Sequence, residues 1–160
     1  MPENPTIKPE ALEPLFAAWE EPEQHRVKRA DGEGATVRKG RRPSSITIAQ
    51  NLRAAVREWR DNFYFGASET TRYLLNHWFG RVHDRREFGG PEEFRYYFCQ
   101  REAMETFIYL KEVRQLERLS QVVAEFGGAN AEIAALGITE GEDAWSRYAF
   151  KMATGSGKTK

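Results

Sequence analysis

The sequence predicts a mainly α-helical protein that passes, near residue 150, into a strand and a phosphate-binding loop. Three observations support this fold class: two amphipathic patterns between residues 44 and 79, a longer apolar run after Pro91, and the motif Met152–Thr159. A chain of 160 residues has room for one ordinary domain, or for a small domain and part of another. Because 24 Lys and Arg balance 24 Asp and Glu, the chain as a whole has no net attraction to nucleic acid.

Residues 1–43 are predicted to form a loose arm that contains a basic segment. Five prolines and six glutamates within residues 1–24 disfavour a long regular element there. A short amphipathic helix fits within this arm, and docking on the chain's own core is its simpler interpretation, with partner binding as the other. The residues at helical spacing are Leu12, Leu15, Phe16 and Trp19.

The basic segment follows at residues 25–43. Val27 and Val37 flank a glycine-bearing turn at residues 31–34, which is typical of a β-hairpin. Positive side chains in such a hairpin are able to lie against phosphates, although a solvated loop explains the same composition. The candidate DNA-binding residues are Arg38, Lys39, Arg41 and Arg42.

Residues 44–90 are predicted to form a helical accessory domain. The first helix opens after Ser44 and Ser45, and Ser68 is a good N-cap for the second, with Glu69 in the first turn. The two helices should pack together across the corner Phe63–Gly66. The predicted apolar side of the first is Ile46, Ile48, Leu52, Val56 and Trp59, and that of the second is Tyr73, Leu74, Leu75, Trp78 and Phe79.

Residues 91–160 begin with a long predicted helix. Pro91 stands at an early helical position, the apolar pattern continues to about Phe126, and Gly127 with Gly128 closes it. Residues 127–146 are predicted to be a loop with a short helical piece at 131–136. Trp145 then marks re-entry into a core, and the alternating segment Tyr148–Met152 predicts a buried strand.

The motif after this strand has the chemistry of a phosphate-binding loop. Gly155 and Gly157 allow successive backbone N–H groups to turn toward phosphate oxygens. Lys158 would reach the β- and γ-phosphates, and the Thr159 hydroxyl would ligate Mg²⁺. The strict motif has glycine where Met152 stands, so a flexible Gly-Ser tail is the other interpretation. The predicted catalytic residues are Lys158 and Thr159, and the loop residues that would bind nucleotide are Thr154, Gly155, Ser156, Gly157, Lys158 and Thr159.

Two segments together resemble the start of a superfamily-two helicase motor. They are the helix opening Phe94–Ala103, with its aromatic residues and Gln100, and the closing motif Met152–Thr159. The resemblance is to the DEAD/DEAH-box branch that includes the Res subunits of type III restriction enzymes, where the loop often reads Met-Ala-Thr-Gly-x-Gly-Lys-Thr. It implies that residues 91–160 are the truncated start of a RecA-like α/β motor domain: its first helix, first strand and loop.

The resemblance also implies a function. The protein would be the N-terminal part of an ATP-dependent DNA helicase or translocase in a restriction–modification or phage-defence system. ATP and Mg²⁺ would be the cofactors, and DNA and a modification (methyltransferase) subunit the partners. Gln100 would read the adenine edge through its side-chain amide, and Phe98 or Phe94 would stack on the base.

The composition also indicates the cellular compartment of the protein, and two alternative functions are left open. A single cysteine, Cys99, suits a reducing cytoplasm, and no apolar run approaches the length of a membrane span. These 160 residues alone are expected not to hydrolyse ATP, because hydrolysis needs further carboxylates and an arginine. The alternatives are a DNA-binding helical module and a small helical interaction protein with a flexible Gly-Ser tail.

Overall fold

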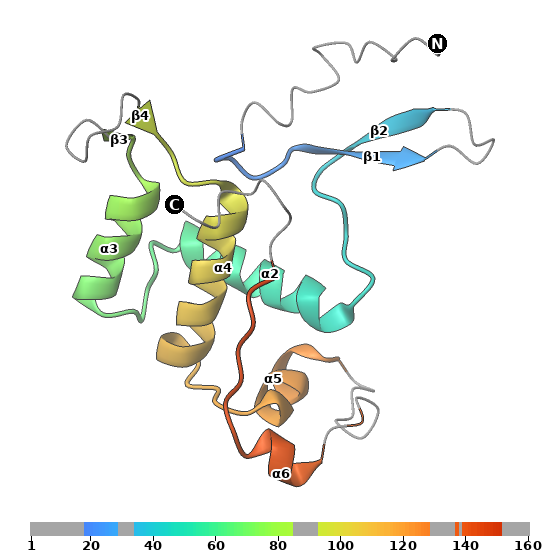
Figure 1. The fold of residues 1–160 in the computed structure, drawn as a ribbon, viewed down its shortest axis with the longest axis vertical. Coiled ribbons are helices and arrows are strands. Elements are labelled where there is room, and N and C mark those ends of the chain that lie inside the picture. The colour runs from blue at the N-terminus through green and yellow to red at the C-terminus, as the bar shows by residue number, and fades with distance from the viewer. Residues whose placement is uncertain (1–17, 29–33, 85–92, 129–136, 138, 152–160) are drawn as a thin grey trace, which may run out of the picture. The chain divides into compact units, whose positions relative to one another are not determined.

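The computed structural model describes residues 18–28, 34–84, 93–128, 137 and 139–151 (Figure 1). The chain divides into two compact units, residues 1–43 and 44–160. Helices predominate among the described residues, as predicted, and two small antiparallel sheets accompany them. The helix predicted around Leu12–Trp19 and the helical piece predicted at 131–136 lie outside the described residues.

The first unit contains a β-hairpin. Strand β1 (Gln24–Lys28) pairs antiparallel with β2 (Ala35–Lys39), in a register that places His25 opposite Arg38 and Gln24 opposite Lys39. The open end of the hairpin is closed by Gly40, whose N–H donates to the Glu23 carbonyl at 2.5 Å. The hairpin predicted from the basic segment is confirmed.

The second unit starts with the two predicted helices, α2 (Thr47–Asp61) and α3 (Glu69–Phe79). The Ser68 hydroxyl accepts the Thr71 N–H at 3.2 Å, which confirms the predicted N-cap. The Glu112 carboxylate accepts the Ser68 N–H at 2.6 Å and the Thr71 hydroxyl at 2.7 Å, so the start of α3 is also held from a distant part of the chain. The prediction that Tyr73 is buried was wrong: its side chain is 68% exposed, because α3 is covered over only part of its predicted apolar side.

The corner between α2 and α3 has an unusual backbone. Phe63 and Tyr64 have φ of 52° and 57°, the left-handed region that L-residues normally avoid. This turn sends the Tyr64 side chain back into the core beside Trp59, with ring centroids 5.0 Å apart, and leaves Phe63 and Phe65 exposed. The indole N–H of Trp59 donates to the Phe65 carbonyl at 2.9 Å, which fixes the turn against α2.

The long helix predicted from residue 91 to Phe126 is divided in the structure. A two-residue strand β4 (Glu93–Phe94) pairs with β3 (His83–Asp84) before α4 (Phe98–Ile108) begins. A π-helical turn, η3 (Tyr109–Val113), follows directly, and the chain then breaks before α5 (Leu119–Phe126). The break contains Gln115 at a φ of 54°, a conformation incompatible with a continuous α-helix. The predicted end of the run, Phe126 followed by Gly127, is confirmed.

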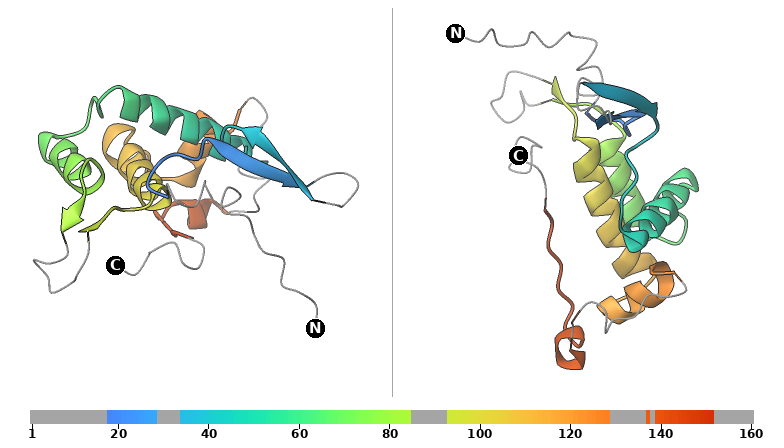
Figure 2. Two further views of the ribbon diagram at one scale, coloured as in Figure 1. Left: turned by 90° about the horizontal axis from the view of Figure 1, so that it is seen from above. Right: turned by 90° about the vertical axis from the view of Figure 1, so that its right-hand side faces the viewer.

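Two apolar clusters hold the second unit together. The first joins α2 to α3 through Trp59, Tyr64, Ala67 and Leu75, which confirms that these helices share a core at their corner. The second joins η3 to α5 through Leu110, Leu116 and Phe126. Tyr109 packs against both clusters. The two further views of Figure 2 show α2 crossing α4.

A short helix, α6 (Glu140–Asp143), leads to the last described segment. The Thr139 hydroxyl caps α6, and the Asp143 carboxylate accepts the Ser120 N–H at 3.0 Å, which attaches α6 to the start of α5. From there, residues 146–151 run beside α4 in the opposite direction (Figures 1 and 2).

Candidate functional site

The predicted nucleotide-binding loop, Thr154–Thr159 with Lys158, lies outside the described residues. The segment that leads into it, Ser146–Lys151, is described, as is Gln100. The structure therefore shows the chain that enters the loop and the surroundings of Gln100.

Residues 146–151, here called the approach segment, are attached to the rest of the unit by every second side chain. The Ser146 hydroxyl donates to the Glu117 carbonyl at 2.6 Å, and the Tyr148 hydroxyl donates to the Leu116 carbonyl at 3.3 Å. The Tyr148 ring meets Phe107 edge-on at 5.0 Å, and the Phe150 ring lies 5.8 Å from the same Phe107. The contacts pass from Glu117 and Leu116 to Phe107 on α4, and the segment runs in the direction of the N-terminal end of α4, where Gln100 lies (Figure 1).

The prediction of a buried strand at Tyr148–Met152 was wrong for the described part of it. Residues 146–151 belong to neither of the two sheets formed by the described residues. Tyr148 and Phe150 are 40% and 55% exposed. Trp145, predicted to re-enter a core, is 74% exposed. An alternating pattern specifies one apolar face, and here a helix covers that face incompletely while no strand pairs with the backbone.

Gln100 lies in the first turn of α4, where its side chain has a structural role. Its Oε1 accepts the Tyr97 N–H at 2.8 Å, as in a capping box. A contact between this oxygen and an adenine edge would have to replace that hydrogen bond. Phe98, a candidate for stacking on the base, is 6% exposed with the Arg60 guanidinium 5.1 Å from its ring centroid, so a base cannot reach it in this conformation. Phe94 is half-buried and its ring stacks on His83 at 5.1 Å.

A buried carboxylate lies next along α4. Glu105 has no exposed surface, and its oxygens accept hydrogen bonds from three side chains. Arg60 on α2 donates through Nε at 2.9 and 3.0 Å and through Nη2 at 2.5 Å. Arg101 donates through Nε at 2.7 Å, and the Tyr64 hydroxyl at 2.7 Å. This network, the Glu105 cluster, connects α2, the strained corner and α4.

The Glu105 cluster shifts the ionisation of the tyrosine in it. Burial of the phenol, with the charge of Glu105 and the hydrogen bond to it, raises the pKa of Tyr64 to about 12. Arg101 Nη2 donates to the same hydroxyl oxygen at 2.8 Å and acts in the opposite direction on this pKa. Because no buried side-chain nitrogen or oxygen of the cluster lacks a hydrogen-bond partner, we assign it a structural role.

The predicted DNA-binding residues do not all lie on one face of the hairpin. Arg38 and Lys39 are adjacent in β2, and their side chains therefore point to opposite faces of the hairpin. Arg41 is half-buried, and Arg42 is exposed beyond the end of the strand. The register brings Lys39 onto the face that carries Arg26 and Lys28 of β1, two residues that were absent from the predicted contact set. The alternation of a paired strand would have identified them from sequence, had the register been known.

Other types of site find no support in the described residues. Among them, no three His, Cys, Asp or Glu side chains gather as a metal site would require. No helix in the part of the chain that the structure describes has the length and apolar character of a membrane span. Comparison with protein-family models, with curated proteins and with solved structures finds no match to this chain.

Proposed function

We propose that this chain carries the ATP-binding loop of a superfamily-two DNA helicase or translocase and forms the N-terminal part of such a motor. By its resemblance, the motor would serve a restriction–modification or phage-defence system in the cytoplasm, acting on DNA together with a modification subunit. One observation carries the proposal: the sequence Met152–Thr159 is entered by an extended segment that heads toward the helix end bearing Gln100.

The chemistry of the loop supports nucleotide as the ligand. Two glycines two positions apart, followed by lysine and threonine, supply a backbone able to surround phosphates, a positive charge and a Mg²⁺ ligand. Mg²⁺ bound with the nucleotide would neutralise charge on the β- and γ-phosphates, and Thr159 would hold it. Lys158 would position the same phosphates.

The attachment of the approach segment also supports the proposal. A phosphate loop works only when the chain that enters it is fixed, because a mobile loop pays an ordering cost on binding. Ser146 and Tyr148 each donate a hydrogen bond to a backbone carbonyl in the break between η3 and α5, and Tyr148 and Phe150 contact Phe107. These contacts hold the chain as far as Phe150, four residues before Thr154.

The test measures Mg²⁺-dependent ATP binding by the protein expressed from its complete natural reading frame. Lys158→Ala should weaken binding about tenfold or more, because it removes a charge-assisted phosphate contact. Lys160→Ala is the matched control: it removes the same charge two residues later, outside the motif, and should change binding by less than about twofold. Equal effects of the two substitutions would overturn the proposal and favour a flexible Gly-Ser tail.

A second measurement concerns the 160 residues alone. They should show no ATP turnover, because phosphoryl transfer also requires a carboxylate to hold Mg²⁺ and place water, and an arginine to neutralise transition-state charge. A turnover abolished by Lys158→Ala would contradict this expectation while supporting the assignment of the loop.

A further inference from the structure

We propose that one face of the β1–β2 hairpin binds the phosphate backbone of duplex DNA. This inference goes beyond ATP binding and does not depend on it. In an antiparallel pair, residues directly opposite each other share a face, and alternate residues along a strand share a face. The register therefore defines one face, here called the basic face, as Gln24, Arg26, Lys28, Ala35, Val37 and Lys39.

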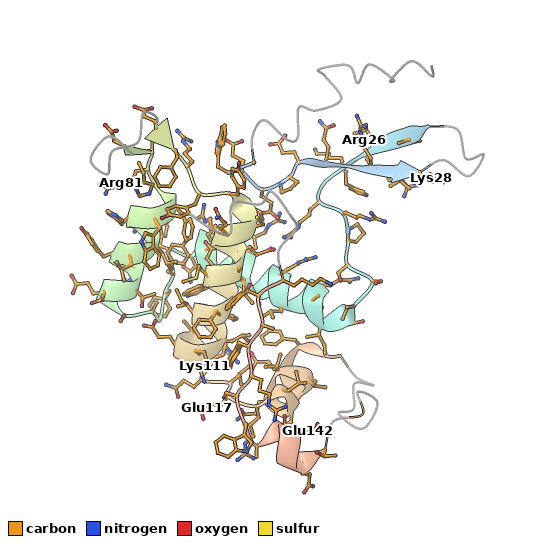
Figure 3. The ribbon with its side chains drawn as sticks, viewed as in Figure 1. Arg26, Lys28, Arg81, Lys111, Glu117 and Glu142 are labelled. Carbon is orange, nitrogen blue, oxygen red and sulfur yellow. The ribbon has the colours of Figure 1, made fainter. Side chains whose placement is uncertain are left out.

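The basic face is exposed and carries positive charge only. All six of its residues are exposed, whereas His25 and Val27, on the other face of β1, are half-buried. The two strands contain four Arg or Lys residues, Arg26 and Lys28 in β1 and Arg38 and Lys39 in β2, and no Asp or Glu. Three of these four cations lie on the basic face. Arg26 and Lys28 are labelled on β1 in Figure 3.

The spacing of the cations suits a polyanion with a regular repeat. Arg26 and Lys28 are two residues apart on one strand, which separates them by about 6.7 Å. One strand of duplex DNA advances about 3.4 Å along the axis per phosphate, so about 6.8 Å for two phosphates. Measured along the helix axis, the two cations are therefore spaced like alternate phosphates of one strand.

The side chains of the basic face favour a duplex over single strands and over membranes. Proteins that bind single strands combine cations with aromatic side chains on which bases stack, and this face has no aromatic residue. Stable anchoring to an anionic lipid surface draws on apolar insertion as well as charge, and Val37 is the only apolar side chain on the face larger than alanine. Its remaining groups suit phosphate contacts that do not read sequence.

The experiment measures fluorescence anisotropy of a labelled duplex of about 25 base pairs with the full chain, without nucleotide, across a salt series. The slope of log affinity against log salt is negative, and Lys39→Gln should make it less steep by about 0.9. The same substitution should weaken binding about eightfold at 0.1 M salt. Arg38→Gln is the matched control, since it is the neighbouring residue, loses the same charge and lies on the opposite face. It should weaken binding by less than about twofold. In the variant that combines Arg26→Gln, Lys28→Gln and Lys39→Gln, the slope should be less steep by about 2.7.

Several outcomes would overturn the inference: equal effects of Lys39→Gln and Arg38→Gln, no duplex binding at low salt, tighter binding to a single strand of the same length, or equal binding to anionic vesicles. Circular dichroism of each variant checks that the fold is retained, and the single substitution at exposed Lys39 keeps the test valid if the triple variant does not fold. Lys158→Ala should leave duplex binding unchanged, and the hairpin variants should leave ATP binding unchanged. Failure of one proposal is therefore distinguishable from failure of the other.

Discussion

Replacing Glu105 by glutamine should destabilise the second unit more than any other single charge removal in its described part. The carboxylate is fully buried, with Arg60 and Arg101 both donating to it, and the Arg60 side chain is itself only 12% exposed. Glutamine keeps the size of the side chain but leaves two guanidinium groups without their counter-charge. Breaking a buried ion pair in this way costs about 3–5 kcal/mol. That is a large share of the roughly 5–15 kcal/mol that stabilises a domain.

The assay is urea unfolding at pH 7, followed by tryptophan fluorescence, since Trp59 packs beside Tyr64 in the first cluster. Glu117→Gln is the control: Glu117 pairs with Lys111 at 3.6 Å (Figure 3), but its side chain is 74% exposed, so its removal should cost less than about 1 kcal/mol. A double-mutant cycle with Arg60→Gln should show coupling of about 0.5–3 kcal/mol. If Glu105→Gln costs no more than the control, the cluster does not contain the ionised, compensated carboxylate that its geometry implies.

Two further predictions concern the corner between α2 and α3. Because the Tyr64 pKa is raised from 10.0 in the unfolded chain to about 12, the unfolded state loses its proton first, and stability should fall as pH rises from 10 to 12. Tyr64→Phe removes this dependence. Between pH 9 and pH 11.5 the free energy of unfolding of the wild type should therefore fall by about 2 kcal/mol more than that of the variant. Equal falls in the two proteins would contradict the raised pKa. Phe63→Gly should raise the free energy of unfolding by about 0.5–1 kcal/mol, because glycine relieves the left-handed strain and the lost ring is 85% exposed. Phe65, where φ is not positive, provides the control: Phe65→Gly should lower the free energy of unfolding by about 0.5–1 kcal/mol. If Phe65→Gly also stabilises the protein, backbone strain is not the cause.

Local signals in the sequence were enough to locate much of the fold. The Ser68 cap, the apolar positions Val56 and Trp59 on α2 and the glycine after Phe126 each act within a few residues, and each is confirmed. The hairpin was predictable for the same reason, since a glycine-bearing turn between two short strands is a local feature. Helix continuity was less predictable: the break at residues 114–118 lies inside an uninterrupted apolar pattern, and tertiary packing around Leu110 and Leu116 determines it.

The Glu105 cluster could not be predicted from the sequence. Arg101 and Glu105 are four residues apart on one helix, a spacing that usually indicates an exposed pair. Burial arises only because Arg60 and Tyr64, more than forty residues earlier in the chain, converge on the same carboxylate. The left-handed turn at Phe63 and Tyr64 makes this convergence possible, and nothing in the local sequence, which has no glycine at either position, signals it.

The side chains of the approach segment alternate between a face that meets the helices and a second face, and the second face limits where the segment can lie in a motor fold. Ser146, Tyr148 and Phe150 face the helices, so Arg147, Ala149 and Lys151 occupy the alternate positions. A strand in the middle of a parallel sheet is covered on both faces and is therefore apolar at nearly every position. Two cations on the second face do not suit such a place, although they suit a strand whose second face meets solvent or phosphate. If the proposed motor is correct, residues 147–151 are therefore not the fully buried part of its first strand. Lys151→Leu should then leave ATP binding by the full reading frame unchanged, whereas a severe loss would indicate that the lysine itself faces the nucleotide.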